Sequence, residues 1–501
     1  MEIDIQTLCF CFLALLILLV TWRKTIGGRS LRLPPGPRRL PIVGNLHQLS
    51  ELPFRSLRDL AKVHGPLMYL KFGSIPVLAV SSADMAREVI KEHELSFTGR
   101  PAGMAPRILS YGCLNMVFSP YGDYWRHVRK ICVQELLSVT RVQSSRFIRE
   151  GEVAQMLDWI GRSATGSSPI NVSEVLLTLT NGIICKAAFG SKYGKSGDGD
   201  SRFQGILGES QAIILGFGIA DFFPYLEWIN KVTGFEEKIH KAFRSLDAFF
   251  EEVIEEHLEP ARPKPDHEDF IDVMLRVQKD TGQGVTLSRL NIKAVIMDMF
   301  LAGTDTTLAT LVWSMTQLVR HPRVMKKAQE EVRRIVGDKE KVHEEDIQQM
   351  DYLKLVLKEV LRLHPPVSLL VPRECTEQCK INGYDIPVKT RLMVNVWAIM
   401  RDPELWEKPE EFWPERFADS PFDFKGQNFQ YIPFGSGRRS CPGNLFGMAT
   451  AELALASLLH SFDWKLPDGM DAEDVDMNEA LGLALHKKCA LQLVATPNPT
   501  M

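Results

Sequence analysis

The chain has 501 residues, enough for one large domain or several small ones. Lysine and arginine number 59 and aspartate and glutamate 62, and the resulting formal charge of −3 gives no indication of a nucleic-acid partner. Hydrophobic residues make up 45% of the chain, as in an ordinary globular protein, and the nine cysteines show no pairing rhythm, which argues against a disulfide framework and favours a reducing compartment.

The first predicted element is an apolar helix. Residues 5–22 carry no charge, and as a helix they span about 27 Å, close to the ~30 Å hydrocarbon core of a bilayer. Acidic residues precede the helix and basic residues follow it, so the positive-inside rule places the rest of the chain in the cytosol. The alternative is a cleaved secretory signal, but neither a basic start nor a small-residue cleavage site is clear. We therefore expect a membrane anchor over residues 1–22.

A basic and proline-rich hinge is predicted over residues 23–41, because Leu33 to Pro37 and Pro41 favour a stiff, extended backbone. The body of the protein is then expected over residues 42–501. Alternating apolar residues over 67–80 predict a β-hairpin interrupted at Gly73 and Pro76. A second group of short strands is predicted over 380–397, with Asn382 and Gly383 as its turn.

Helical periodicity dominates from residue 83 onward. Long helices are predicted over 123–138, 144–162, 172–189, 236–258, 287–320, 323–336, 351–363 and 444–461. Surface loops are predicted over 191–202 and 260–267, where glycine, proline and polar residues gather. The pattern predicts a mainly α protein with a small β region, folded as one domain after the anchor.

An unusual polar string, Ala302-Gly303-Thr304-Asp305-Thr306-Thr307, lies inside the apolar helix predicted over 287–320. Glycine in a helix interior costs about 1 kcal/mol relative to alanine, and threonine hydroxyls can bond back to the preceding turn and bend the helix. We therefore expect a local opening that admits a small ligand and a water. The alternative is a close crossing of two helices at small residues.

An acid and a base, Glu359 and Arg362, share one face of the helix predicted over 351–363. The residues around them are apolar, which indicates a buried pair, and a buried arginine must satisfy five donors. The segment Phe412 to Phe417 offers a second partner for the pair.

The most informative string is Phe434-Gly435-Ser436-Gly437-Arg438-Arg439-Ser440-Cys441-Pro442-Gly443, which leads into the last long helix. The helix amino terminus and the two arginines favour a thiolate at Cys441 and predict a lowered pKa for its thiol. A nucleophile would need a nearby base, a zinc site would need more cysteine or histidine, and a single thiolate suffices for haem iron. A buried structural cysteine is the remaining alternative.

This string resembles the haem-binding loop of the cytochromes P450, whose pattern F-G-x-G-x-R-x-C-x-G is met at every fixed position. The resemblance extends over essentially the whole chain. The string over 302–307 is similar to the family's oxygen-activating segment, Glu359 and Arg362 to its E-x-x-R pair, and Trp125 with Arg129 to its W-x-x-x-R pair. The resemblance implies the cytochrome P450 fold, one transmembrane helix before it, and haem b as the cofactor.

The resemblance also implies roles for individual residues. Cys441 would be the axial iron ligand, Asp305 and Thr306 would form the acid–alcohol pair that supplies protons for cleavage of the O–O bond, and Glu359, Arg362 and Arg416 would form a network behind the haem loop. Further residues are expected to contact haem, several of them through its propionates, and these are Arg439, Trp125, Arg129, Arg373, Arg100, Phe434, Gly435 and Gly443.

No glycine-rich nucleotide loop follows a predicted strand, so electrons must come from another protein. The resemblance implies NADPH–cytochrome P450 reductase as that partner, cytochrome b5 as a further candidate partner, and residence in the endoplasmic reticulum membrane with the catalytic domain facing the cytosol. A basic face on or near the thiolate side is expected to steer the acidic reductase, and its candidate residues are Arg126, Arg129, Lys130, Arg438 and Arg439.

The expected substrate pocket is apolar, which suits a hydrophobic small molecule. By family position its candidate residues, each of which could instead be plain core, are Met104, Phe217, Phe222, Ile296, Met299, Phe300, Ala302, Val367, Leu370 and Leu481. The proline-rich start, the 413–417 string and the arginine pair before Ser440 are similar to the plant A-type branch, which implies a specialised metabolite, with a terpenoid or alkaloid favoured over a phenolic or flavonoid.

The leading hypothesis is a monooxygenase that hydroxylates an unactivated C–H bond. A second hypothesis uses the same haem for desaturation, rearrangement or ring formation. A third is a haem protein that binds a ligand without turnover, and the intact pair of Asp305 and Thr306 argues against it.

Overall fold

The structure, a computed structural model, describes residues 31–101, 103–164, 168–190, 219–263, 265–280 and 287–498, together with isolated positions between 192 and 213. The predicted anchor, residues 23–30 of the predicted hinge and nearly all of the predicted 191–202 loop lie outside the described residues. The α-helices are α2 (Pro53–His64), α3 (Ala83–Arg87), α4 (Met104–Leu109), α5 (Asp123–Ile131), α6 (Val139–Ser144), α7 (Arg146–Ser163), α8 (Val172–Phe189), α10 (Ile219–Phe222), α11 (Glu227–Val232), α12 (Phe235–Leu258), α13 (Phe270–Lys279), α14 (Arg289–Arg320), α15 (Pro322–Val336), α16 (Glu344–Ile347), α17 (Asp351–Leu363), α18 (Val396–Ile399) and α19 (Asn444–Ser461).

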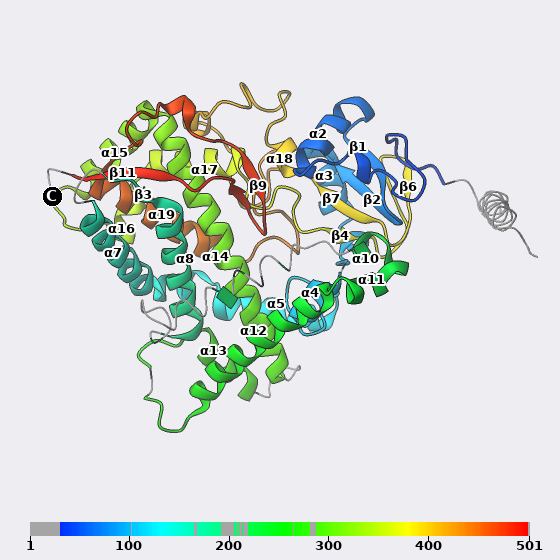
Figure 1. Ribbon diagram of the computed structural model, residues 1–501, viewed down its shortest axis with the longest axis horizontal. Helices are drawn as coiled ribbons and strands as arrows, with labels where there is room; N and C mark the ends of the chain where they lie inside the picture. Colours follow the sequence, from blue (N-terminus) through cyan, green and yellow to red (C-terminus); the bar gives the residue numbers. More distant parts are fainter. Residues whose placement is uncertain are drawn as a thin grey trace, which may run out of the picture.

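The strands of the described residues are short and form four small sheets. They are β1 (Leu67–Phe72), β2 (Ile75–Val80), β3 (Ile170–Asn171), β4 (Arg373–Glu374), β5 (Cys379–Ile381), β6 (Tyr384–Ile386), β7 (Arg391–Val394), β8 (Phe462–Lys465), β9 (Glu479–Leu481), β10 (Leu485–Lys487) and β11 (Gln492–Pro497). The largest sheet has the order β1-β2-β7-β4, with β2 and β7 parallel and the other pairs antiparallel. Figure 1 shows this sheet beside α2 and α3 at one end of the molecule, while most of the long helices lie at the other.

The mainly α architecture with a small β region agrees with the prediction, and each predicted long helix is present. The helix predicted over 123–138 is divided, because α5 passes into a π-helical turn at Cys132–Leu136. The predicted turn of the second strand group is also present, since Asn382 and Gly383 have φ of 46° and 76° between β5 and β6.

Several elements were missed. The sequence reasoning did not find α2, α4 or α13, nor the carboxyl-terminal strands β8 to β11. Strand β11 pairs with β8, which precedes it closely in the chain, and with β3, which lies more than 300 residues away. Strands this short are stabilised mainly by the strands they pair with, so the periodicity of their own sequence does not predict them.

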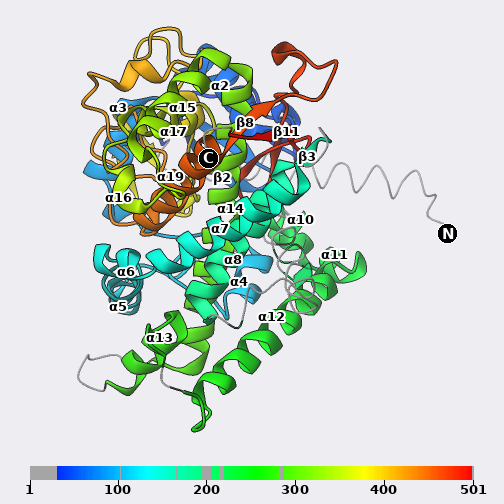
Figure 2. The same ribbon diagram turned by 90° about the vertical axis from the view of Figure 1, so that its left-hand side faces the viewer.

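Helix α14 runs through the middle of the molecule (Figures 1 and 2). It begins with a capping box between Ser288 and Asn291, and it ends before Pro322, which opens α15 at its first turn. It packs against α8, α17 and α19. Both α8 and α14 are long and apolar enough to span a bilayer, but 72% and 83% of their most apolar windows are buried within the protein. Their apolar character is therefore explained by the core.

The described part of the proline-rich hinge lies against the large sheet. The amide of Tyr69 on β1 donates to the Pro35 carbonyl over 2.9 Å, and a Cβ on Gly36 would lie 2.6 Å from the Tyr69 carbonyl oxygen. Asn45 also donates from its side chain to the carbonyl of Pro37. This stretch is consequently fixed to the body of the protein along β1.

Candidate active site

The loop that carries Cys441 is folded tightly against the amino end of α19. The amide of Cys441 donates to the Phe434 carbonyl over 2.9 Å, and Gly443 is the N-cap residue of α19. Gly435 and Gly437 have φ of 68° and 73°, a region that disfavours other residues. A Cβ on Gly437 would also lie 2.3 Å from a carboxylate oxygen of Glu94. This loop geometry leaves Cys441 exposed to an internal cavity that it helps to line.

The protonation of Cys441 differs from the prediction. Burial raises the pKa of its thiol above the ordinary value, although the amides of Gly443 and Asn444 and the charge of Arg129 act in the opposite direction. The expectation of a lowered pKa is therefore wrong for the protein without a metal, because loss of hydration outweighs the helix terminus. A bound metal ion would deprotonate the thiol directly.

The cavity is enclosed by segments that are far apart in the chain. Its walls come from α14, the α5 region, the stretch after α17, the Cys441 loop and the start of α19, and the lining residues are Arg100, Met116, Val117, Trp125, Arg129, Leu137, Ile184, Phe270, Asp298, Met299, Ala302, Gly303, Thr306, Thr307, Thr310, Pro366, Val367, Leu370, Val371, Arg373, Pro433, Phe434, Gly435, Arg439, Ser440, Cys441, Pro442, Gly443, Phe446, Gly447, Met448 and Ala451. Thr306 and Cys441 thus face one common space.

Thr306 and Asp305 have different surroundings. The hydroxyl of Thr306 lines the cavity and donates to the Ala302 carbonyl over 2.8 Å, the back-bonding expected for a threonine in a helix. The carboxylate of Asp305 instead accepts from the Ala484 amide over 2.8 Å and lies 3.0 Å from Nε2 of His486. Asp305 is therefore bound to the β9–β10 hairpin and is not among the described residues that line the cavity.

His486 was missed by the sequence reasoning. It lies 181 positions after Asp305, on a strand of three residues, and nothing in the local sequence links the two. Only the packing of β10 against α14 brings them together.

The glycine of the polar string is explained by helix packing. A Cβ on Gly303 would lie 2.6 Å from Cδ1 of Ile184 on α8, so α8 and α14 approach most closely where Gly303 lacks a side chain. Helix α14 is also continuous from Arg289 to Arg320. The expected local opening is thus absent from the described helix, and the close crossing that was the alternative interpretation is present.

Four arginines line the cavity, and their positive charges have no carboxylate partner among the described residues. Arg100 donates to the carbonyls of Val117, Val371 and Pro372, and the other three also donate to backbone carbonyls. Burial lowers the pKa of Arg373 and Arg439 to about 10, and neighbouring arginines act in the same direction, while the charge of Glu94 acts in the opposite direction on Arg373. For Arg100, burial followed by the charges of Arg439, Arg373 and Arg129 holds the pKa well below its ordinary value.

Such a cluster fits a ligand that carries carboxylates. Four partly or fully buried guanidinium groups in one cavity repel one another, and anionic groups would relieve that repulsion. Haem carries two propionates, so the arginine cluster, defined as Arg100, Arg129, Arg373 and Arg439, together with a single thiol in the same cavity, fits that cofactor. Trp125 lines the cavity too, but its indole N–H already donates to the Met116 carbonyl over 2.9 Å.

The predicted network of Glu359, Arg362 and Arg416 is assembled in the core. Arg362 donates to Glu359 from Nε over 2.7 Å and from Nη2 over 2.9 Å, and Arg416 donates to Glu359 over 3.0 Å. Both Glu359 and Arg362 have no exposed surface. Arg362 also donates to the carbonyls of Met400, Pro409 and Glu411, so each nitrogen of its guanidinium has a partner.

The expected substrate residues fall into two groups. Met299, Ala302, Val367 and Leu370 line the cavity, while Phe217 lies outside the described residues. The others do not line it: Met104, Ile296 and Phe300 are buried in the core, Phe222 on α10 packs against the β1–β2 sheet, and Leu481 on β9 is 46% exposed. Residues 296 and 300 differ from 299 and 302 because successive positions on a helix face different neighbours.

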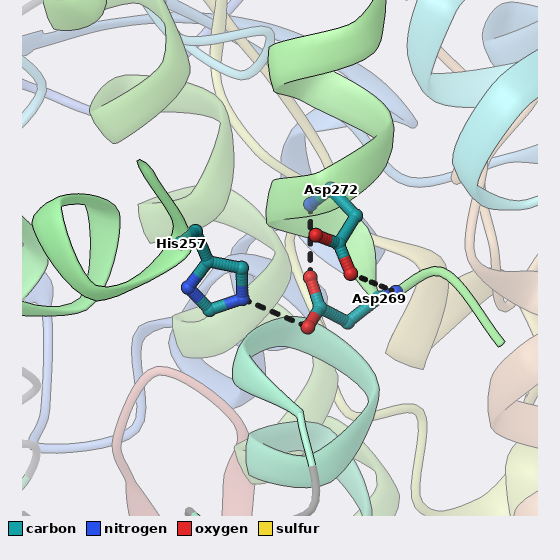
Figure 3. A group of neighbouring side chains, drawn as sticks. All are labelled: His257, Asp269 and Asp272. Atoms are coloured by element: carbon teal, nitrogen blue, oxygen red, sulfur yellow. Dashed lines mark hydrogen bonds and ion pairs between the residues drawn. The ribbon is translucent and has the colours of Figure 1, made fainter. Parts of the chain in front are cut away.

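A group of possible metal ligands lies between α12 and α13 and consists of His257, Asp269 and Asp272 (Figure 3). His257 Nε2 lies 2.9 Å from Asp269, while Asp269 and Asp272 each accept from the other's amide in a capping box. Arg262 donates to both carboxylates. With the guanidinium supplying the positive charge, the group is an ion-pair network that caps α13.

The chain is similar to known proteins over nearly its whole length. A family model described as Cytochrome P450 matches residues 34–493. The chain is 51% identical over 494 residues to Cytochrome P450 71A9 of Glycine max, covering 97% of this chain and 98% of that protein. It is 49% identical to strychnine-11-hydroxylase of Strychnos nux-vomica, with 98% and 97% covered, and 48% identical to premnaspirodiene oxygenase of Hyoscyamus muticus, with 97% of each covered.

The fold is also similar to that of a solved structure. A zebrafish cytochrome P450 with abiraterone superposes with a TM-score of 0.74 at 24% identity, covering 90% of this chain and all of that one. At this level of identity the likeness bears on the fold alone.

Proposed function

This chain belongs to the cytochrome P450 family of haem-iron monooxygenases, and on that premise we propose that it is a membrane-bound enzyme that hydroxylates a hydrophobic plant specialised metabolite with O2 and with electrons from NADPH. The observation that carries the proposal is the single cavity lined by Cys441, by Thr306 and by the arginine cluster. A thiol, a hydroxyl and unpaired cations in one mostly apolar space suit haem and an apolar substrate together.

Haem b held through Cys441 would supply the oxygen activation and the one-electron chemistry. The residues of the chain bind and orient it: the arginine cluster neutralises the propionates, and Gly435 and Gly443 let the loop backbone approach closely. The Thr306 hydroxyl donates to Ala302 and keeps its lone pairs, so Oγ1 can accept a hydrogen bond from a water in the cavity. To pass a proton on, the hydroxyl would turn its O–H away from the Ala302 carbonyl and be reprotonated by that water.

The favoured substrate is a terpenoid or an alkaloid. The printed names of two relatives support this class, since one is a strychnine-11-hydroxylase and another a premnaspirodiene oxygenase. The apolar side chains of Met299, Ala302, Val367 and Leu370 offer a surface that suits either kind of scaffold.

The redox partner in this proposal is an NADPH-dependent reductase, with cytochrome b5 as a further partner. Exposed basic residues support a docking face beside the Cys441 loop, because Lys130 is exposed on the same helix as Arg126, and Arg126 and Arg438 both lie over the Tyr121 ring, at 5.6 and 5.9 Å. Arg126 and Arg438 are also paired with Asp123 and Glu94 on this surface. The apolar segment over residues 5–22 supports an anchor in the endoplasmic reticulum membrane.

The decisive experiment is expression with a reductase, followed by spectroscopy and product analysis. The reduced protein with carbon monoxide should show the long-wavelength Soret band of sulfur ligation, and Cys441→Ser should abolish it. Candidate terpenoids and alkaloids are then screened by binding spectra and incubated with NADPH under 18O2. Incorporation of one labelled atom supports hydroxylation, whereas desaturated, rearranged or cyclised products without label support the second hypothesis. A folded wild-type protein without the Soret band would refute the proposal.

The location is tested separately. Full-length protein should sediment with microsomes and resist extraction by alkaline carbonate, and a variant without residues 1–30 should lose that resistance. If alkaline carbonate released the full-length protein from the membrane, the predicted anchor would be wrong.

A further inference from the structure

Asp298 is a buried acid that the known motifs do not include. It lies on α14, is 5% exposed and lines the cavity. It precedes Ala302 by four positions and Thr306 by eight, so the three residues share one face of the helix, and all three line the cavity. A buried carboxylate needs a physical reason, because burial of an unpaired charge is costly.

The partners of Asp298 come from one loop. Its Oδ1 accepts from the Asn115 side chain over 2.5 Å, and its Oδ2 accepts from the amides of Met116 and Val117 over 2.7 and 3.2 Å. Asn115 in turn accepts from the Phe118 amide over 3.1 Å. The donors that satisfy Asp298 thus belong to a single stretch, the 115–119 segment, which lies between α4 and α5 in the chain.

The carbonyls of the same segment accept hydrogen bonds from a different set of residues. The Met116 carbonyl accepts from Trp125, the Val117 carbonyl accepts from Arg100 over 3.1 Å and from Arg439 over 3.4 Å, and the Ser119 carbonyl accepts from Arg439 over 2.8 Å. Two members of the arginine cluster are therefore held in part by this segment. The Met116 and Val117 amides bind α14, and the Val117 and Ser119 carbonyls bind the arginines.

We propose that Asp298 is a positioning residue that fixes the 115–119 segment between α14 and the arginine cluster. Loss of its carboxylate then removes the hydrogen-bond acceptor of the Met116 and Val117 amides. The 115–119 segment becomes more mobile, and Arg100 and Arg439 bind the cofactor more weakly. The second part rests on the proposed function, since it takes haem as the ligand of the cluster. The first part depends only on contacts within the chain.

The test uses the haem-loaded protein in four forms: wild type, Asp298→Ala, Asp298→Asn and the control Ser314→Ala. Ser314 is buried on the same helix, donates to the Thr310 carbonyl over 2.7 Å and does not line the cavity. Asparagine keeps one acceptor oxygen at position 298, so its effect should be intermediate, and it provides a folded variant if alanine is not tolerated.

The first readout is hydrogen exchange by mass spectrometry in peptides that cover residues 115–118. Exchange should be about tenfold faster in Asp298→Ala, the factor that corresponds to about 1.4 kcal/mol, and less accelerated in Asp298→Asn. Peptides from α19 serve as an internal reference and should not change, and neither should the segment in Ser314→Ala. Unchanged exchange of the segment in both Asp298 variants, or an equal rise throughout the protein, would overturn the proposal.

The second readout is the rate of haem transfer to excess apomyoglobin. Asp298→Ala should lose haem about fivefold faster or more, the lower end of typical coupling between two sites, while Ser314→Ala keeps the wild-type rate. If hydrogen exchange of the segment were faster in Asp298→Ala but haem were lost at the wild-type rate, the second part of the proposal, that Asp298 affects cofactor binding, would be overturned. Failure of wild type to hold haem would refute the proposed function instead, and the exchange comparison, made then on the four proteins as isolated, would still report on Asp298.

Discussion

At the scale of single residues, Thr306 and Asp305 show how neighbours in a helix come to serve different surfaces. Thr306 lines the cavity, while Asp305 is held by Ala484 and His486 on the β9–β10 hairpin. Adjacent positions on a helix are turned by about a hundred degrees, so the two side chains cannot face the same space unless one of them changes rotamer. Any transfer of protons between them needs water or movement of Asp305.

The Thr306→Ala variant should bind haem as well as wild type does, because among the described residues its hydroxyl forms a hydrogen bond only with the Ala302 carbonyl. Product formed per NADPH oxidised should fall about tenfold or more, with hydrogen peroxide released instead, because a positioned proton donor typically contributes at least that factor. The measurement is NADPH consumption, peroxide and product in one assay. An unchanged product yield per NADPH would show that the hydroxyl has no part in the reaction.

Asp298 should give the protein a pH-dependent stability. Burial raises the pKa of this carboxyl to about 7, against the action of its three hydrogen-bond donors. Between the ordinary pKa of an aspartate and pH 7 the native state therefore holds its proton more tightly than the unfolded chain does, so the free energy of unfolding falls as pH rises through this window, by at most about 4 kcal/mol. Above pH 7 the loss is complete.

The check is urea unfolding of wild type and Asp298→Asn at pH 5, 6, 7 and 8. The variant should show a smaller decline with pH, because asparagine does not titrate. Cys132 and Tyr124 lie close enough for the charge of Asp298 to raise their pKa values, so both residues are kept unchanged in the comparison. If the free energy of unfolding of the two proteins changed with pH to the same extent, Asp298 would not be the group responsible.

At the scale of elements, α17 and the segment after it carry the Glu359 network. The pair of Glu359 and Arg362 is fully buried, and Arg416 arrives from a short 3-10 helix, Pro414–Phe417. A buried ion pair that is completely hydrogen-bonded contributes little when it is compared with an apolar substitute, but removal of one partner leaves an uncompensated charge in the core.

The Arg362→Ala variant should consequently be destabilised by about 3–5 kcal/mol and should be recovered with little or no haem. Lys62→Ala is a matched control, because Lys62 and Asp59 form a pair at the same helical spacing on the exposed surface of α2, where the loss should stay below about 1 kcal/mol. Chemical unfolding and the haem-to-protein absorbance ratio measure both quantities. Equal stability of the two variants would show that burial of the pair does not matter.

At the scale of the whole molecule, the cavity is made by segments that meet only after folding. Arg100, Arg129, Arg373 and Arg439 come from four parts of the chain, and their charges repel one another because none of them forms an ion pair with a carboxylate among the described residues. Both the unfilled cavity and this repulsion should therefore lower the free energy of unfolding of the protein without haem.

Removal of haem should lower the thermal unfolding temperature. A ligand that binds only the native state stabilises it by about 4 kcal/mol when its concentration is a thousand times its dissociation constant. Extraction of haem removes this stabilisation. Calorimetry of the loaded and extracted protein, followed by reloading, provides the measurement. The Cys441→Ser variant is the control, since it keeps the arginines but lacks the sulfur ligand. Equal unfolding temperatures for loaded and extracted wild type would indicate that the cavity does not bind haem.

The amino-acid sequence by itself determined the long helices, the first hairpin, the motif loop around Cys441 and the family resemblance, because helical periodicity, turn residues and short motifs are local properties. It did not determine the pKa of Cys441, the partner of Asp305, the role of Gly303 or the contacts of Asp298. Each of these depends on a group contributed from elsewhere in the chain: the desolvating walls of the cavity, the β9–β10 hairpin, Ile184 on α8 and the 115–119 segment. Burial and hydrogen bonding arise from tertiary packing, and for that reason only the folded structure decided them.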